Sequence, residues 1–172
     1  MEPGDNRKLK LQIASLRSNN RSAILETIKE LRSAGDVSVL PELFNLLLVQ
    51  EDVEILAEIT SLLNDLKNQD AAEILALAIS NPEFQQIQTT LVAACWQNGL
   101  SYGKHLPVFV DVVISGGYRA AIEAFTVIEE AVGDLEQEDR EALVHSLKAR
   151  IEQVDQQKRA LFVELVKVIE NY

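Results

Sequence analysis

The chain has 172 residues, 47% of them hydrophobic and 5% aromatic, and its 16 Lys and Arg against 27 Asp and Glu give a formal net charge of −11. A chain of this length buries roughly 70% of its unfolded surface, so it needs neither a disulfide nor a metal to fold, and the single cysteine excludes an internal disulfide. We expect one domain over residues 1–172. The acidity argues against a protein that grips nucleic acid or an anionic membrane through its overall charge.

The N-terminal residues have no apolar stretch after their basic residues, so they do not resemble a secretion signal. The longest strongly apolar stretches, 46–49 and 108–114, are much shorter than the ~20 residues of a membrane span. We therefore expect a cytoplasmic protein.

Apolar residues recur every three or four positions along nearly the whole chain, which is the spacing of an amphipathic helix. In chain order they predict about ten helices, near residues 9–16, 24–31, 40–47, 55–63, 74–79, 87–94, 106–113, 122–128, 137–154 and 156–171. Residues 108–114 are rich in β-branched side chains and resemble a strand locally. We predict a helix there, because no second strand-like segment exists to pair with it.

The breaks between these helices carry capping chemistry. Asn81-Pro82-Glu83 is typical of a helix start, and Asp70 with Glu73 resembles a capping box. Four glycines and one further cap mark other boundaries: Gly35, Gly99, Gly116 and Gly133 as helix ends, and Asp155 as the cap between the last two helices.

The second helices of successive pairs share one register. Three apolar columns align at separations of 31, 32 and 34 residues: Ile24, Ile55, Ile87 and Ala121; Ile28, Ile59, Leu91 and Phe125; Leu31, Leu62, Ala94 and Ile128. A period of 30 to 35 residues built from helix pairs indicates an α-solenoid, in which each pair buries its apolar face by stacking on its neighbours. We predict an all-α superhelix of about ten antiparallel helices in about five pairs.

The segment 39–63 resembles a HEAT repeat. Its first helix begins with Leu40-Pro41, an acidic turn follows, and its second helix has the form Val-x-x-x-Ala-x-x-x-x-Leu. Segment 106–128 is similar, and Arg119 there fills the place of a basic residue that HEAT units often carry, which Asp52 and Val53 do not in 39–63. The resemblance covers residues 20–132 and implies an armadillo-type fold with a role in protein interaction. If Ser38 caps the helix, Pro41 lies in the first turn, where its missing N–H breaks no bond.

The last two helices, within 136–172, match the columns poorly. We interpret them as a terminal pair that closes the solenoid against water. Their polar faces consist of Arg140, Glu141, Lys148, Arg150, Glu152, Lys158, Arg159 and Glu164.

The residues indicate no catalytic, cofactor or metal site. Gly116-Gly117 precedes Tyr-Arg rather than the Lys-Ser or Lys-Thr of a phosphate loop. Cys95 lies among apolar residues and is interpreted as a core thiol. His105 and His145 have no second ligand at metal-binding spacing.

Trp96 occupies a register position that is polar in the other units, about 180° from Ile87 around its helix. Two interpretations follow: ordinary core under the adjacent helix pair, or a partly exposed aromatic of the type that dominates interfaces. For Phe84 and Tyr118, at helix starts, we favour packing against loops. In the second interpretation, one polar and acidic strip crosses the second helices around Trp96, and its other residues are Glu58, Thr60, Thr89, Glu123, Thr126 and Glu130.

The acidity is concentrated in the repeats. Residues 35–135 hold 15 acidic and 3 basic residues, whereas residues 1–34 hold 7 basic and 4 acidic ones. We therefore expect a protein-interaction scaffold, with no catalysis, that binds a basic protein segment through salt-sensitive contacts on the second helices. The alternatives are a HEAT-like DNA glycosylase and a prosthetic-group lyase or chaperone scaffold. Homo-oligomers are also open, because the basic first helices can meet the acidic middle of a second copy.

Overall fold

The computed structural model describes residues 3–34 and 36–172, which form ten α-helices joined by short turns and 3₁₀ helices, with no strand. The helices are α1 (Pro3–Leu16), α2 (Arg21–Ala34), α3 (Leu40–Val49), α4 (Val53–Asn64), α5 (Asp70–Ser80), α6 (Gln88–Asn98), α7 (Leu106–Ser115), α8 (Tyr118–Val132), α9 (Gln137–Ala149) and α10 (Arg159–Glu170). The predicted all-α, repeat-like fold is confirmed, and so is the helix over 108–114, which lies in α7.

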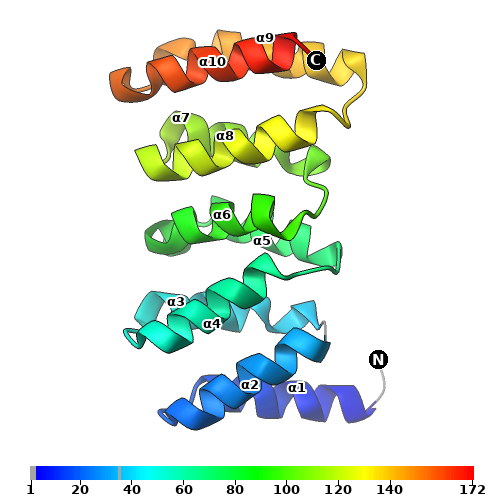
Figure 1. Ribbon diagram of the computed structural model, residues 1–172, viewed down its shortest axis with the longest axis vertical. Helices are drawn as coiled ribbons and strands as arrows, with labels where there is room; N and C mark the ends of the chain where they lie inside the picture. The colour runs from blue at the N-terminus through cyan, green and yellow to red at the C-terminus, as the bar shows by residue number, and fades with distance from the viewer. Residues whose placement is uncertain (1–2, 35) are drawn as a thin grey trace.

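The helices stack as five pairs in two layers (Figure 1). The even-numbered helices α2 to α10 form the layer nearer the viewer, and the odd-numbered helices lie behind them. The ends of the chain lie at opposite ends of the stack. Each pair therefore contacts its sequence neighbours, which is the arrangement that the repeat predicts.

The core lies between the two layers and between successive pairs. All three predicted columns point into it: eleven of their twelve residues are buried, and Phe125 is partly buried against the others. Ile28, Ile59 and Leu91 have no exposed surface. The register deduced from the sequence therefore identifies the side chains that join one pair to the next.

Polar contacts between successive pairs have the same period. Asn64 Nδ2 donates a hydrogen bond to Gln97 Oε1 at 2.7 Å, 33 residues away. Gln69 exchanges two hydrogen bonds with the backbone of Ser101, 32 residues away. Equivalent positions in neighbouring pairs thus lie side by side, as the 31 to 34-residue alignment requires.

The capping predictions are partly right. Asn81 accepts a hydrogen bond from Glu83 N at the start of the 3₁₀ helix Pro82–Ile87, and Gly99 ends α6 with a left-handed φ of 68°. Two other predictions, Asp70 and Ser38 as caps, are wrong, because in each case the residue two positions earlier does the capping. Asn68 accepts from the backbone N–H of Asp70, and Asp36 accepts from that of Ser38. The predicted helix end at Gly35 lies outside the described residues.

Lys158 joins the terminal pair to the repeats. We predicted it on a solvated polar face, but its side chain is buried, with Nζ 2.6 Å from the carbonyl oxygen of Ile114 and 2.8 Å from that of Gly116. These carbonyls lie at the C-terminal end of α7, where the helix dipole favours a cation. Burial lowers the pKa of Lys158 below its ordinary value. Arg150 makes a second link, because its Nη1 lies 2.7 Å from a carboxylate oxygen of Asp111 on α7.

Within the described residues, no helix combines the length and the apolar character that crossing a membrane requires.

Candidate functional site

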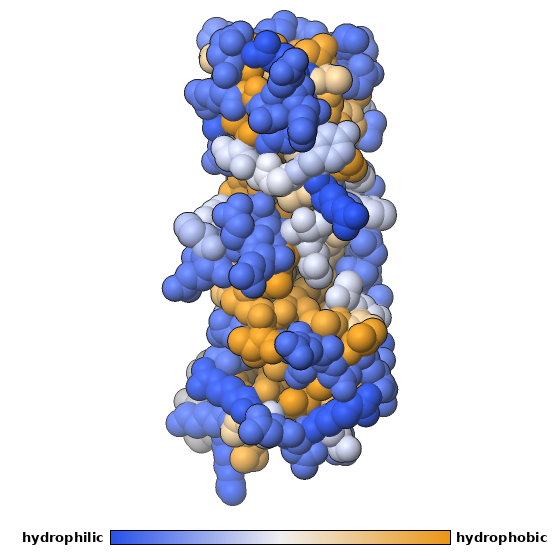
Figure 2. Space-filling model, turned by 90° about the vertical axis from the view of Figure 1, so that its left-hand side faces the viewer, coloured by the Kyte–Doolittle hydropathy of each residue, from blue (hydrophilic) through white to orange (hydrophobic). Residues whose placement is uncertain are grey.

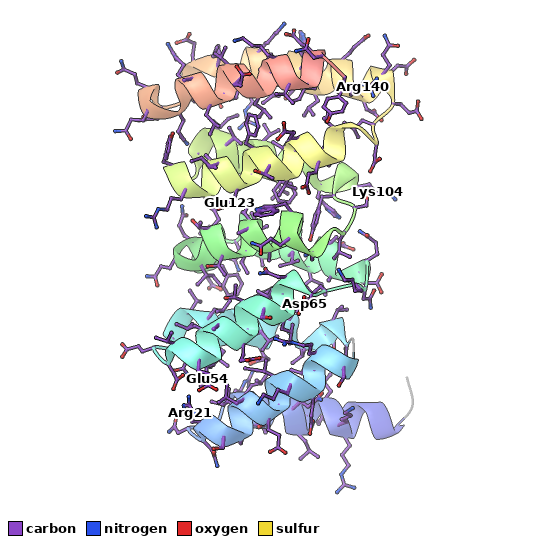
Figure 3. The ribbon with its side chains drawn as sticks, viewed as in Figure 1. Arg21, Glu54, Asp65, Lys104, Glu123 and Arg140 are labelled. Atoms are coloured by element: carbon purple, nitrogen blue, oxygen red, sulfur yellow. The ribbon has the colours of Figure 1, made fainter. Side chains whose placement is uncertain are left out.

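Trp96 lies on the outer surface of α6 and is 36% exposed. Its indole Nε1 donates a hydrogen bond to Glu123 Oε2 on α8 at 2.7 Å. The exposure and this bond decide between the two interpretations of Trp96. It is a partly exposed aromatic, and a carboxylate from the next helix pair holds it in place. Figure 3 shows Glu123 between α6 and α8. Aromatic side chains fixed in this way lose little entropy when a partner covers them.

Three of the other predicted residues lie beside Trp96 in the same surface. Glu123, Thr126 and Glu130 follow one another on α8 at helical spacing, so they share one face. Thr89 lies two turns before Trp96 on α6 and is half-buried. We define the α6–α8 surface by Thr89, Trp96, Glu123, Thr126 and Glu130.

The two predicted residues on α4 are occupied by contacts within the chain. The Glu58 carboxylate lies 3.2 Å from Nη2 of Arg32 on α2. Thr60 Oγ1 donates to the carbonyl oxygen of Leu56 in its own helix at 2.8 Å. Thr126 on α8 makes the same kind of bond, to the carbonyl oxygen of Ile122 at 3.4 Å. The predicted strip therefore divides by its carboxylates: Glu58 on α4 pairs with a cation, whereas no ion pair among the described residues includes Glu123 or Glu130 on α8.

The basic N-terminal helices neutralise the acidic residues of the second pair. Arg17 pairs with Glu42, and Arg21 pairs with Asp52 and Glu54 across the turn (Figure 3). The hydrogen bond from Arg21, with those from the backbone of α4, lowers the pKa of Asp52. Three of the seven cations that we expected to meet a second copy, Arg17, Arg21 and Arg32, thus contact acids of the same chain.

The carboxylates of α8 have no such partner. None of the ion pairs among the described residues involves Glu123, Glu129 or Glu130. The one cation of α8, Arg119, precedes Glu123 by one turn but forms no ion pair with it in the described part of the chain. The negative charge left over by internal pairing therefore includes the α6–α8 surface.

Sequence reasoning missed two features of this surface. Ile122 is 41% exposed and precedes Glu123, although its place in the apolar pattern of α8 indicated a core residue. Helix α6 carries no charged residue over Gln88–Asn98, which the sequence shows directly. The surface thus combines an uncharged α6 with apolar and acidic side chains on α8.

The two other aromatics at helix starts differ from each other. Phe84 is partly buried, but it packs against Phe44 of helix α3 rather than against a loop, with ring centroids 5.8 Å apart and planes at 72°. Tyr118 is 52% exposed, so the prediction that it packs against a loop is wrong. Tyr118 begins α8 directly after Gly117, where the turn leaves its ring at the edge of the stack.

Cys95 is buried, and its Sγ lies 3.3 Å from the carbonyl oxygen of Leu91. Burial raises the pKa of its thiol to about 12 and also raises that of the neighbouring Tyr102 phenol. A thiol of this pKa stays protonated at neutral pH and is a poor nucleophile. In the described part of the chain, no three His, Cys, Asp or Glu side chains come together as a metal site would require.

Two other surface features lie away from the α6–α8 surface. A groove of about 640 Å³ separates α7 from α9, with Leu106, Pro107 and Leu143 on its walls and Lys104, Asp134 and Asp139 along its length. An apolar area appears on the side of the stack formed by the turns inside the pairs (Figure 2). Val49 and Val53, which flank the α3–α4 turn, are 76% and 79% exposed.

Comparison with models of known protein families finds none that matches the chain, and no curated protein matches its sequence.

Proposed function

We propose that the protein is a HEAT-like interaction scaffold without catalysis of its own, which binds a basic protein segment on the α6–α8 surface. The observation that carries this proposal is the partly exposed Trp96, fixed by Glu123 beside carboxylates that no described cation neutralises. Tryptophan is the residue type most enriched among the residues that dominate binding energy at interfaces. Complementary charge steers association and makes it depend on salt.

Ion pairs within the chain reduce the part of the acidic face that is available to a partner. Four acids of the second pair, Glu42, Asp52, Glu54 and Glu58, are paired with Arg17, Arg21 and Arg32, so a partner that binds to these four must displace the arginines. The α8 carboxylates need no such exchange. We therefore place the partner over α6 and α8 rather than over the whole second-helix layer.

The alternative functions receive no support from the residues on these helices. A DNA glycosylase of the HEAT-like type uses a basic groove, whereas α4, α6 and α8 together carry one cation, Arg119. For a prosthetic-group lyase or chaperone the chain offers no residue specific for a cofactor.

Affinity capture with the purified chain tests the proposal. We expect Trp96→Ala to reduce capture of a protein partner about tenfold or more, as loss of an interface anchor does. Tyr118→Ala, which removes an exposed aromatic from the start of α8, outside the α6–α8 surface as defined above, is the matched control and should capture normally. Raising NaCl from about 50 mM to about 500 mM should also reduce capture. Capture that ignores both Trp96 and salt contradicts the proposal.

A further inference from the structure

The hydrogen bond between Trp96 and Glu123 leaves one carboxylate oxygen free. Glu123 Oε2 accepts from the indole at 2.7 Å, and no hydrogen bond to Glu123 Oε1 exists among the described residues. A carboxylate has about four acceptor sites, of which this bond uses one. Because the bond holds the carboxylate against α6, its free oxygen is fixed before a ligand arrives.

Exposed apolar side chains lie on both helices that this bond joins. Trp96 is 36% exposed and Ile122 is 41% exposed, and they come from the two helices that the hydrogen bond joins. A ligand group that suits both features needs an apolar stem and a cationic end. Arginine fits better than lysine, because its planar guanidinium binds carboxylates in a fork, packs on aromatic rings and is less strongly hydrated.

We propose that the partner of the α6–α8 surface inserts an arginine side chain beside Trp96, with its guanidinium on Glu123 and its stem against Trp96 and Ile122. This proposal rests on the proposed function and names the chemistry of the partner. Charge complementarity supports it, because no Lys or Arg of the described chain forms an ion pair with Glu123.

Glu130 specifies a second contact. It lies seven residues after Glu123 on α8, and at a rise of 1.5 Å per residue the two positions are roughly 10 Å apart on one face. A segment in the polyproline II conformation has three residues per turn and advances roughly 3.1 Å per residue, so two side chains three residues apart lie on the same side and roughly 9 Å apart. An extended partner segment of this kind, with two arginines separated by two residues, therefore reaches both carboxylates.

Trp96 makes this testable, because it is the only tryptophan of the chain. Its indole N–H gives a single NMR signal, and its fluorescence reports this surface alone. The probe is a synthetic peptide with two arginines separated by two residues. One control peptide carries citrulline, the neutral isostere, at both positions, and a second carries lysine.

We expect the arginine peptide to shift the indole N–H signal and to bind at least tenfold more tightly than the citrulline peptide, with the lysine peptide between them. Glu123→Gln retains an acceptor for the indole but removes the charge, and it should weaken the arginine peptide about tenfold; Glu130→Gln should weaken it less. Glu26→Gln on α2 is the matched control and should bind as the unchanged chain does. Thermal unfolding of each variant confirms that it folds.

Equal binding of the arginine and citrulline peptides, or an indole signal that the arginine peptide does not move, overturns the proposal. If a protein partner is still captured in a Trp96-dependent manner, the arginine inference fails and the proposed function stands. If the arginine peptide binds as expected but Trp96→Ala captures partners normally, the inference stands and the proposed function fails.

Discussion

We call the interface between two successive helix pairs a joint. The first joint, between α1–α2 and α3–α4, contains ion pairs, whereas the central joints contain other hydrogen bonds. Arginines of the first pair contact carboxylates of the second, as in Arg17 with Glu42 and Arg32 with Glu58. The central joints have no ion pair among the described residues. Asn64 bonds to Gln97, Gln69 to Ser101 and Lys67 to the carbonyl oxygen of Asn98, and Trp96 bonds to Glu123 in the next joint. In both kinds of joint the contacts join residues 25 to 33 positions apart, so stacking brings successive pairs together but does not fix the chemistry between them.

This difference shows why acidic residues of similar number have different roles along the chain. Carboxylates of the second pair complete the structure, because the cations that neutralise them come from the preceding pair. Carboxylates of α8 follow a helix without charge, α6, and have no cation of the described chain in contact. In the proposed function, the carboxylates of α8 are therefore the ones that a basic partner can neutralise.

The largest expected effect tests whether the joints share the same apolar packing. Ile59 and Leu91 hold the same register position in the two regions, and neither is exposed. We expect Ile59→Ala and Leu91→Ala each to lower the free energy of unfolding by about 3 kcal/mol, through lost transfer energy and a cavity. Urea denaturation measures both. A much smaller loss for Ile59→Ala would mean that ion pairs replace apolar packing in the first joint.

An intermediate effect tests the last joint, between α7–α8 and the terminal pair, where Lys158 donates to two carbonyls at the C-terminal end of α7. Lys158→Ala leaves two carbonyls without their donor and should cost about 2 kcal/mol, as loss of a buried hydrogen-bond partner does. Lys167→Ala removes an exposed lysine from α10, the helix that follows Lys158 directly, and we expect little change in urea denaturation. If both variants unfold alike, the capping contact does not hold the terminal pair.

The smallest effect tests the charged joint itself. A double-mutant cycle on Arg32 and Glu58 should give a coupling of about 0.5 kcal/mol at low salt, since exposed ion pairs contribute little. The coupling should vanish near 1 M NaCl, where screening is nearly complete. The same cycle on Asn64 and Gln97 should be insensitive to salt. Equal salt sensitivity of the two cycles would remove the distinction between the joints.

Much of the candidate site could be predicted from register, because stacked repeats place equivalent residues side by side. Trp96 and Glu130 hold the same repeat position, and Glu123 holds that of Thr89. Register could not show that Glu58 is bonded to Arg32, since this depends on how far two long side chains reach across a joint. Nor could it show the exposure of Ile122, whose apolar character is the same in a core or on a surface.

The sequence by itself determined the all-α fold, the repeat and the buried columns, because apolar spacing dictates which helix face leaves water. It also determined that Cys95 lies in the core. Only the tertiary structure decided which charges remain free, because pairing depends on distances between residues some thirty positions apart. It likewise decided that Lys158 is buried and that Trp96 is held at the surface, since the first depends on two carbonyls and the second on one carboxylate from a neighbouring helix pair.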